Sequence, residues 1–227
     1  MEETKAEAPH PSETGPINEE KKILCTAAIV LVADQLSKQL VVRALEGGEK
    51  KILIDGFLRV VNWQNTGAAW SMFQDSSLPL AALSMVALIA LIKYRHHFET
   101  HTPTGKIAVG LLIGGIVGNL IDRLIATLKQ TSQGIFEMQI QGSSWASGTT
   151  GKLLDTIKNI SQYIVETTRM GDGVVDFVRF YIIRSDGSEL GYPAFNIADM
   201  GICIGVGLLF FLAWREGVSE EETEKDS

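Results

Sequence analysis

The run IADMGICIGVGLLFFLAW, residues 197–214, has one ionisable side chain, Asp199, near its start and is otherwise almost entirely apolar. A helix needs about 20 mostly apolar residues to cross the hydrocarbon core of a membrane. This run is therefore predicted to be a transmembrane helix with a carboxylate close to one end. An ionisable group at membrane depth is costly, so Asp199 is a candidate functional residue.

Three further apolar segments precede this run. They cover residues 23–42, 78–92 and 107–128, and the second reaches spanning length only with its flanking residues. Their apolar residues surround the helix instead of forming the one-sided stripe of a helix on a soluble protein. The sequence predicts an all-α membrane protein with four transmembrane helices.

The segment between the first two predicted helices, residues 51–73, has a different pattern. It contains the pair Asp55-Gly56, a common two-residue hairpin turn, between short runs rich in β-formers. A further strand is predicted at residues 174–181, followed by a turn at residues 185–188. We expect a small β-sheet at the membrane surface.

The region between the third and fourth predicted helices, residues 124–173, is long and has two parts. Residues 130–151 are polar and rich in Ser, Thr and Gly. After them, apolar residues recur at spacings of four, three and four, which places them on one helical face. They are Leu153, Ile157, Ile160 and Ile164. The sequence predicts an amphipathic helix on a polar tether.

The net charge of −7 comes from the two ends of the chain. Residues 1–22 are acidic and nearly without large apolar side chains, so they are predicted to be a disordered, solvated tail. Residues 215–227 form a second acidic tail. Nucleic acid is excluded as a partner, because phosphate binding needs a basic surface and no part of the chain supplies one.

The cysteines and histidines give no sign of a metal site. Cys25 and Cys203 each lie alone in an apolar run and are predicted to be buried. His96, His97 and His101 lie in a short polar loop with few other ligand groups, which favours a solvated loop over a metal site. No metal and no cofactor are expected.

Ionisable and amide side chains gather toward one end of three of the predicted helices. Asp34 and Lys38 are four residues apart, so they share a helical face and can pair. The third helix holds Asn119, Asp122 and Arg123, and the fourth holds Asn196 and Asp199. If both termini lie on one side of the membrane, these groups all fall toward the opposite side, where they can converge.

Each of these groups also has a purely structural explanation. Asp34 with Lys38 can be an ion pair at a helix end, with the lysine reaching the interface. Asp122 with Arg123 can be an interfacial pair that ends the third helix. Asp176 follows a Gly-rich turn on a predicted strand, where an Asp has ordinary surface uses. The residues alone do not choose which two carboxylates react.

Two carboxylates held close together are chemically useful without a metal. Both cannot ionise at short range, so they share a proton; one then acts as a base toward water while the other donates to a carbonyl oxygen. The sequence offers no rival nucleophile. It has no Gly-x-Ser-x-Gly elbow, and both cysteines lie in apolar surroundings.

Five blocks of the sequence, in this order, are similar to the five motifs of the signal peptidase II family. They are residues 34–38 (DQLSK), 65–71 (NTGAAWS), 114–123 (GGIVGNLIDR), 174–177 (VVDF) and 193–199 (PAFNIAD). The resemblance covers residues 23–214, and five blocks in order are a specific match.

This resemblance implies an all-α membrane fold of four transmembrane helices with both termini in the cytoplasm. Residues 51–73 would form a small extracytoplasmic β-cradle, and residues 124–173 would be an extracytoplasmic insertion. The catalytic dyad implied is Asp176 with Asp199, near the outer face of the bacterial inner membrane. Positions that line the site or hold substrate match Asn65, Gly67, Asn119, Arg123 and Asn196, and supporting positions match Asp34, Lys38 and Asp122.

The activity that the resemblance implies is that of an aspartyl endopeptidase. Such an enzyme activates water to remove the signal peptide from a diacylglyceryl-modified prolipoprotein, cutting before the lipidated cysteine. The expected partners are therefore lipid-modified prolipoproteins and membrane lipid, and the chain is expected to be a monomer.

The chain departs from the family pattern in three places. Trp70 stands where Phe is usual, the acidic amino-terminal extension is long, and residues 124–173 are inserted. Loop closure costs only about 0.6 kcal/mol more per doubling of length, so the insertion need not disturb the dyad. We hypothesise that the amphipathic helix near residues 153–165 lies on the outer leaflet as a lid or substrate guide; the alternative is an insertion packed outside the site.

Two other classes of protein stay open. A proton-coupled transporter or channel subunit also holds buried Asp, Arg and Asn, but it would have internal repeats and broken helices, and the sequence contains no such repeat. A non-catalytic membrane protein that binds lipoproteins would have lost a dyad residue, whereas Asp176 and Asp199 are both present.

Overall fold

The computed structural model describes residues 16–45, 49–67, 77–98, 102–140, 148–168 and 173–225. The helices in these residues are α1 (Pro16–Ala44), α2 (Ser77–Tyr94), the short 3-10 helix η3 (Arg95–His97), α3 (Pro103–Ile140), α4 (Gly148–Thr168) and α5 (Ile197–Lys225). The strands are β1 (Lys50–Ile54), β2 (Leu58–Asn65), β3 (Val174–Ile183) and β4 (Glu189–Gly191).

Four of the helices are long and apolar enough to cross a membrane. These spans are Glu20–Ala44, Ser77–His97, Pro103–Gln133 and Ile197–Val218, and they contain the four predicted apolar segments. Many of their large side chains point outward, as Ile29 and Phe210 do. An apolar exterior of this extent is typical of a surface that faces lipid. The prediction of a mostly helical protein with four membrane helices and a small sheet is confirmed.

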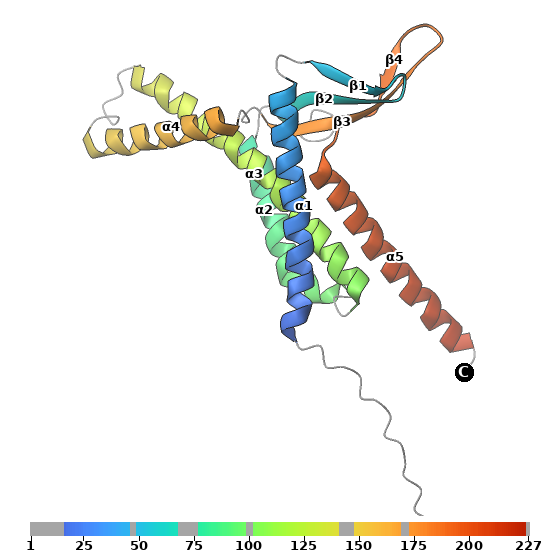
Figure 1. The fold of residues 1–227 in the computed structure, drawn as a ribbon. Coiled ribbons are helices and arrows are strands. Elements are labelled where there is room, and N and C mark those ends of the chain that lie inside the picture. Colours follow the sequence, from blue (N-terminus) through green and yellow to red (C-terminus); the bar gives the residue numbers. More distant parts are fainter. Residues whose placement is uncertain are drawn as a thin grey trace, which may run out of the picture.

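Helix α3 lies in the middle of the helical bundle, in contact with α1, α2 and α5 (Figure 1). Two of its glycines make this possible. A Cβ atom at Gly114 would meet the backbone carbonyl of Ala27 in α1, and one at Gly115 would meet that of Ala198 in α5. Small residues let helix backbones approach closely in a membrane. The polar residues of α1, α3 and α5 are thereby brought within hydrogen-bonding range of one another.

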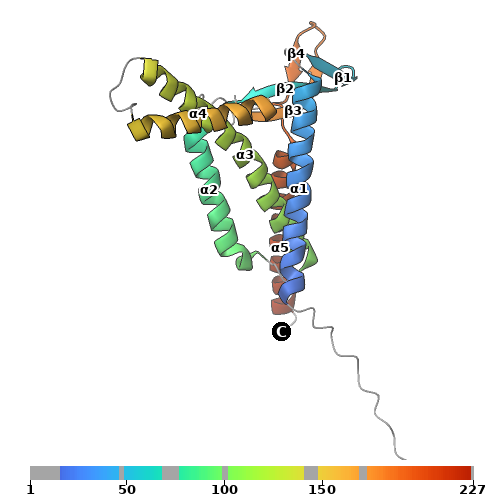
Figure 2. The ribbon, with the colours of Figure 1, turned by 60° about the vertical axis from the view of Figure 1, so that its left-hand side comes forward.

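The four strands form one antiparallel sheet in the order β1-β2-β3-β4. It lies at the end of the bundle where α1 ends and α5 begins, while the start of α1 and the end of α5 lie at the opposite end (Figures 1 and 2). Pairing of β2 with β3 brings together segments far apart in the chain. This pairing sets Asn65 of β2 near Asp176 of β3.

The hairpin between β1 and β2 forms at the predicted place, but its loop has a different length. It runs from Asp55 to Phe57, and the Phe57 N–H donates to the carbonyl of Ile54 (3.1 Å). Gly56 has a φ of 69°, a left-handed conformation that glycine adopts without steric cost. The turn is therefore a three-residue loop and not the two-residue turn predicted.

The region between α3 and β3 differs from the prediction. Helix α3 continues to Ile140, so it does not end at Asp122-Arg123, and residues 130–140 are helical instead of forming a tether. Lys, Gln, Glu and Met are good helix formers, so a polar sequence can prolong a helix that has already begun. Helix α4 then crosses back over the end of α3 (Figure 1). It contains the helix predicted near residues 153–165.

Three smaller predictions also differ from the structure. Cys25 and Cys203, predicted to be buried, are exposed, because each lies on a side of its helix that faces out of the bundle. Helix α1 begins at Pro16, inside the tail predicted to be disordered, and α5 continues through the acidic carboxyl-terminal segment. Trp70 and His101 lie outside the described residues.

Candidate active site

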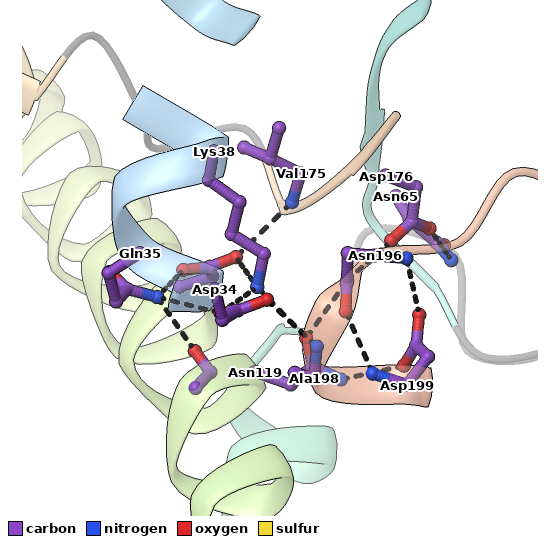
Figure 3. A network of polar contacts seen from close by, with 12 residues as sticks. Asp34, Gln35, Lys38, Asn65, Asn119, Val175, Asp176, Asn196, Ala198 and Asp199 are labelled. Atoms are coloured by element: carbon purple, nitrogen blue, oxygen red, sulfur yellow. Dashed lines mark hydrogen bonds and ion pairs between the residues drawn. The ribbon is translucent and has the colours of Figure 1, made fainter. Parts of the chain in front are cut away.

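Asp176 lies on β3 and is 5% exposed. Both of its carboxylate oxygens accept hydrogen bonds from amide side chains (Figure 3). Asn65 Nδ2 donates to Oδ2 (3.1 Å), and Asn196 Nδ2 donates to Oδ1 (2.8 Å). The Gly67 backbone N–H in turn donates to Asn65 Oδ1 (3.1 Å), which directs the amide nitrogen of Asn65 toward Asp176. The buried carboxylate is thus held in a fixed orientation.

Asp199 lies in the first turn of α5, and its position follows from how that helix begins. Asn196 precedes the helix and caps it: its Oδ1 accepts from the Asp199 N–H (2.9 Å), and its own N–H donates to Asp199 Oδ2 (3.2 Å). This reciprocal pair is a capping box. Asn119 of α3 donates to Asp199 Oδ1 (2.8 Å). A negative side chain is also favoured at a helix amino terminus by the helix dipole.

Asn196 is the residue that connects the two carboxylates. Its Oδ1 accepts from the N–H of Asp199, and its Nδ2 donates to Asp176. The backbone supports the same arrangement, because Phe195 and Val178 exchange two hydrogen bonds (2.9 and 3.0 Å). The start of α5 is therefore attached to the strand that carries Asp176, which keeps the two carboxylates on one side of the membrane bundle.

Beneath the two carboxylates, Lys38 of α1 is the centre of a fully buried ionic cluster. Its Nζ contacts Asp34 Oδ2 (2.7 Å) and Asp122 Oδ2 (2.9 Å) and donates to Asn119 Oδ1 (3.1 Å). The side chains of Asp34, Lys38 and Asp122 are all 0% exposed. The predicted pairing of Asp34 with Lys38 is found, but Asp122 binds Lys38 instead of forming an interfacial pair that ends α3.

The two buried carboxylates of this cluster each hold the backbone next to one of the candidate catalytic residues. Asp122 Oδ2 accepts from the N–H of Val175 (3.2 Å), the residue before Asp176. Asp34 Oδ1 accepts from the N–H of Ala198 (2.9 Å), the residue before Asp199. Figure 3 shows Val175 and Ala198 near Lys38 and Asp34. The cluster therefore fixes the distance between β3 and the start of α5.

The pKa of Asp176 is raised from its ordinary value of 3.8 to about 7. Burial is the largest cause, and the negative charge of Asp199 adds to it. The hydrogen bonds from Asn65 and Asn196, and the charge of Lys38, act in the opposite direction. A carboxyl group with such a pKa holds its proton near neutral pH, while a second carboxylate lies close by.

Arg123 is half-buried on α3, and its charge interacts with Asp176, Asp199 and Asp122. The structure thus brings together all ten residues singled out in the sequence. They are Asp34, Lys38, Asn65, Gly67, Asn119, Asp122, Arg123, Asp176, Asn196 and Asp199. Among the described residues, no group of His, Cys, Asp and Glu is arranged to hold a metal ion.

One polar residue of this network was not assigned a role from the sequence. Gln35 Nε2 donates to Asp34 Oδ2 (3.2 Å), to the carbonyl of Gly118 (3.2 Å) and to Asp122 Oδ1 (3.1 Å). It therefore joins α1 to α3 beside Lys38. An amide within an apolar membrane segment was the signal that would have identified it.

Known proteins resemble this chain over most of its length. A model of the family described as signal peptidase (SPase) II matches residues 26–215. The lipoprotein signal peptidase of Anoxybacillus flavithermus is 29% identical over 190 residues, which cover 84% of this chain and 83% of the relative. That of Bacillus subtilis is 27% identical over 184 residues, covering 81% and 87%.

A solved structure gives the same fold. It is a bacterial membrane enzyme determined by the in meso method at 2.3 Å, with a TM-score of 0.56 and 23% identity, covering 87% of this chain and 90% of that one. With four helices able to cross a membrane and relatives from bacteria, the chain is a bacterial membrane protein. The family match covers most of its length, and the chain belongs to the signal peptidase II family.

Proposed function

We propose that this protein is an aspartyl endopeptidase that removes the signal peptide from diacylglyceryl-modified prolipoproteins. The observation that carries the proposal is the pair Asp176 and Asp199, two carboxylates linked through Asn196, of which Asp176 has a pKa raised to about 7. Two carboxyl groups that share a proton cleave amides without a metal. Relatives named lipoprotein signal peptidase support the substrate class.

The roles of the two carboxyl groups follow from their surroundings. Asp199, at the amino terminus of α5, takes a proton from water, and the water oxygen attacks the scissile carbonyl carbon. Asp176 gives its proton to the carbonyl oxygen, which forms a tetrahedral diol. When this diol collapses, one of its hydroxyl groups returns a proton to Asp176, the C–N bond breaks, and the proton held by Asp199 passes to the leaving amine. Lys38 donates to Asn119, and Asn119 donates to Asp199, so both residues position the pair.

The sheet is proposed as the cradle that holds the polypeptide substrate. Phe180 lies four residues after Asp176 on β3, so both point to the same face of the strand. Rings of Phe57 and Phe195 lie 5.2 and 5.9 Å from the Phe180 ring, and the Tyr192 ring lies 6.3 Å from that of Phe195. This aromatic row leads away from Asp176 and offers a surface for an extended chain.

The proposed orientation places the sheet and Asp176 at the outer face of the inner membrane and both termini in the cytoplasm. The support is that α1 begins, and α5 ends, at the end of the bundle opposite to the sheet. Substrate with a lipid anchor in the outer leaflet then meets the dyad without crossing the membrane. The alternative of a transporter has less support, because the four spans are continuous helices within the described residues.

The proposed activity is tested with purified protein and two forms of one precursor, with and without diacylglyceryl on the cysteine. We expect the modified form alone to be shortened on a gel, and the product to begin at the lipidated cysteine by mass spectrometry. Cleavage of both forms, or at another bond, would contradict the proposed specificity. Failure to cleave either form would contradict the proposed function.

The rate of cleavage is expected to fall as the pH rises through about 7, because the proton donor Asp176 is then lost. The variant Asn65→Ala removes a hydrogen bond that lowers this pKa. In this variant the fall in the cleavage rate should therefore occur at a higher pH than in the wild type. The measurement is the initial rate between pH 5 and 9, at about half-unit steps, for both proteins. Asn159→Ala, on the exposed side of α4, is the matched control and should keep the wild-type profile. If the cleavage rate of Asn65→Ala falls at the same pH as that of the wild type, the fall does not report the pKa of Asp176.

Phe180→Ala is expected to raise KM by a factor of about three to ten with kcat nearly unchanged, because the ring contacts substrate away from the reacting bond. The matched control is Ile183→Ala, which removes an exposed apolar side chain from the opposite face of the same strand. Steady-state kinetics on the lipidated precursor separate the two parameters. Equal effects of the two substitutions would argue against the aromatic row as the substrate surface.

A further inference from the structure

Helix α4 packs against α3. Ser161, on the side of α4 that faces α3, is 1% exposed. A cavity of about 290 Å³ lies between the two helices. Its lining is polar except for one valine: Lys129, Ser132, Gln133, Lys158, Ser161, Gln162, Val165 and Glu166. The contact between α3 and α4 therefore leaves much of the apolar surface of α4 uncovered.

One face of α4 carries a stripe of apolar residues, Leu153, Ile157, Ile160 and Ile164, called here the α4 stripe, of which Ile157 and Ile164 are half-buried. Their spacing places them on one face of the helix. Leu153 is 60% exposed and Ile160 is 54% exposed. Exposed polar residues, Asn159 and Glu166 among them, lie on the other side of the helix. Such a helix has one face for a lipid phase and one for water.

The place of α4 in the molecule points to lipid as the phase that covers the stripe. Its axis lies across the direction of α1 in both views, at the end of the bundle that carries the sheet (Figures 1 and 2). Because the four spans fix the direction of the membrane normal, α4 lies near the membrane plane.

The depth of α4 follows from the length of α3. Its candidate span, Pro103–Gln133, has 31 residues, about 46 Å of helix, whereas the hydrocarbon core is about 30 Å thick. The last outward apolar residues of this span are Leu124 and Leu128, and the cavity begins at Lys129. The polar groups between α3 and α4 therefore lie at the depth of lipid head groups.

We propose that α4 is an interfacial helix whose stripe inserts among the acyl chains of the membrane leaflet on the side of the sheet. Its polar side and the cavity lined by Lys129 and Lys158 face the head groups and water. Helix α4 thereby anchors the extended end of α3 beside the candidate active site. The inference concerns lipid contact only and does not rest on the proposed reaction.

The test uses the full chain with Cys25→Ser and Cys203→Ser, reconstituted at one copy per lipid nanodisc. A single cysteine is placed by Ile160→Cys or by Asn159→Cys and labelled with an environment-sensitive fluorophore. These neighbours differ by about 100° around the helix, so one label faces the stripe and the other faces water. Lipid with a spin label high in its acyl chain is expected to quench the label at 160 at least threefold more strongly than the label at 159.

Leu153→Cys, on the stripe, is expected to behave like Ile160→Cys, which shows that the effect belongs to the face and not to one position. Equal quenching at 159 and 160, or no quenching at 153 and 160, would overturn the proposal. Quenching that disappears when two copies share a nanodisc would show that a second copy covers the stripe instead of lipid, and would also overturn it. Cleavage of the precursor, measured separately on each variant, keeps this outcome distinct from that of the proposed function.

Discussion

Asp176→Asn and Asp199→Asn are each expected to lower the rate of precursor cleavage by a factor of about 10³–10⁴. Asn has nearly the size of Asp, so the space around the pair is preserved. At position 199 it cannot take a proton from water, and at position 176 it has no carboxylic acid proton to give. The measurement is the initial rate with lipidated precursor on a gel, at saturating substrate and pH 6, below the pKa of Asp176.

The matched control for the dyad is Asp186→Asn. Asp186 lies in the exposed turn between β3 and β4, where its Oδ1 accepts from the Ser188 N–H (2.8 Å). Asn makes the same turn contact, so this variant should cleave at the wild-type rate. Cleavage at the wild-type rate by either dyad variant would remove that residue from the mechanism.

Asp176→Asn should lose less stability than the wild type as the pH rises, which separates loss of chemistry from loss of structure. The folded state raises the pKa of Asp176 to about 7, so it keeps a proton that the unfolded chain releases above its ordinary value of 3.8. The stability of the wild type should therefore fall as the pH rises from about 4 to about 7 and then level off, and Asn removes this fall. Thermal unfolding in detergent at pH 5 and pH 8 measures the difference. A variant whose stability falls between these two pH values as much as that of the wild type would contradict this account of Asp176.

The second large effect is expected from Lys38→Met, which should destabilise the folded protein by about 3–5 kcal/mol. Met fills similar space but leaves the carboxylates of Asp34 and Asp122 buried without a cation at 2.7 and 2.9 Å. Removal of one partner from a buried ion pair is far more costly than removal of the pair. Cleavage should also be lost, because the backbone next to Asp176 and Asp199 is held by these two carboxylates.

The control for Lys38→Met is Lys50→Met on β1, whose side chain is exposed. Its effect on stability should be within about 0.5 kcal/mol. Thermal unfolding in detergent, followed by tryptophan fluorescence, compares the two. A combined variant that replaces Lys38 by Met and both Asp34 and Asp122 by Asn should regain part of the lost stability. If Lys38→Met unfolds at the wild-type temperature, the buried cluster does not hold the fold.

The membrane helices, and the polar residues within them, could be predicted from strong local signals in the sequence, whereas Asn65, Gly67 and the role of Asp176 came only from the resemblance to a family. An apolar run of spanning length has few other uses, and Asp199 at the start of such a run stands out at once. The capping box between Asn196 and Asp199 is also readable from a spacing of three residues. Even the pair Asp34 and Lys38 follows from helical geometry alone.

What the sequence did not reveal depends on partners far away in the chain. Asp122 stands beside Arg123, which suggested a local pair, but the close packing of α1 on α3 places Lys38 nearer. The continuation of α3 to Ile140 was missed because its end is polar, and helix propensity is a weaker signal than an apolar pattern. The face of α4 that packs on α3 was also missed, because most of the residues that face α3, such as Ser161 and Gln162, are polar and leave no apolar pattern in the sequence.

The contacts of Lys38 also bear on how the protein is made. Among the described spans, the lysine is carried by the first, Asp122 by the third and Asp199 by the fourth, while Asp176 lies on the strand between the last two. The proposed pair is complete only when all of these segments have docked. If the proposed function holds, a partly inserted chain should not cleave its neighbours in the membrane, and activity should appear when the fourth span docks.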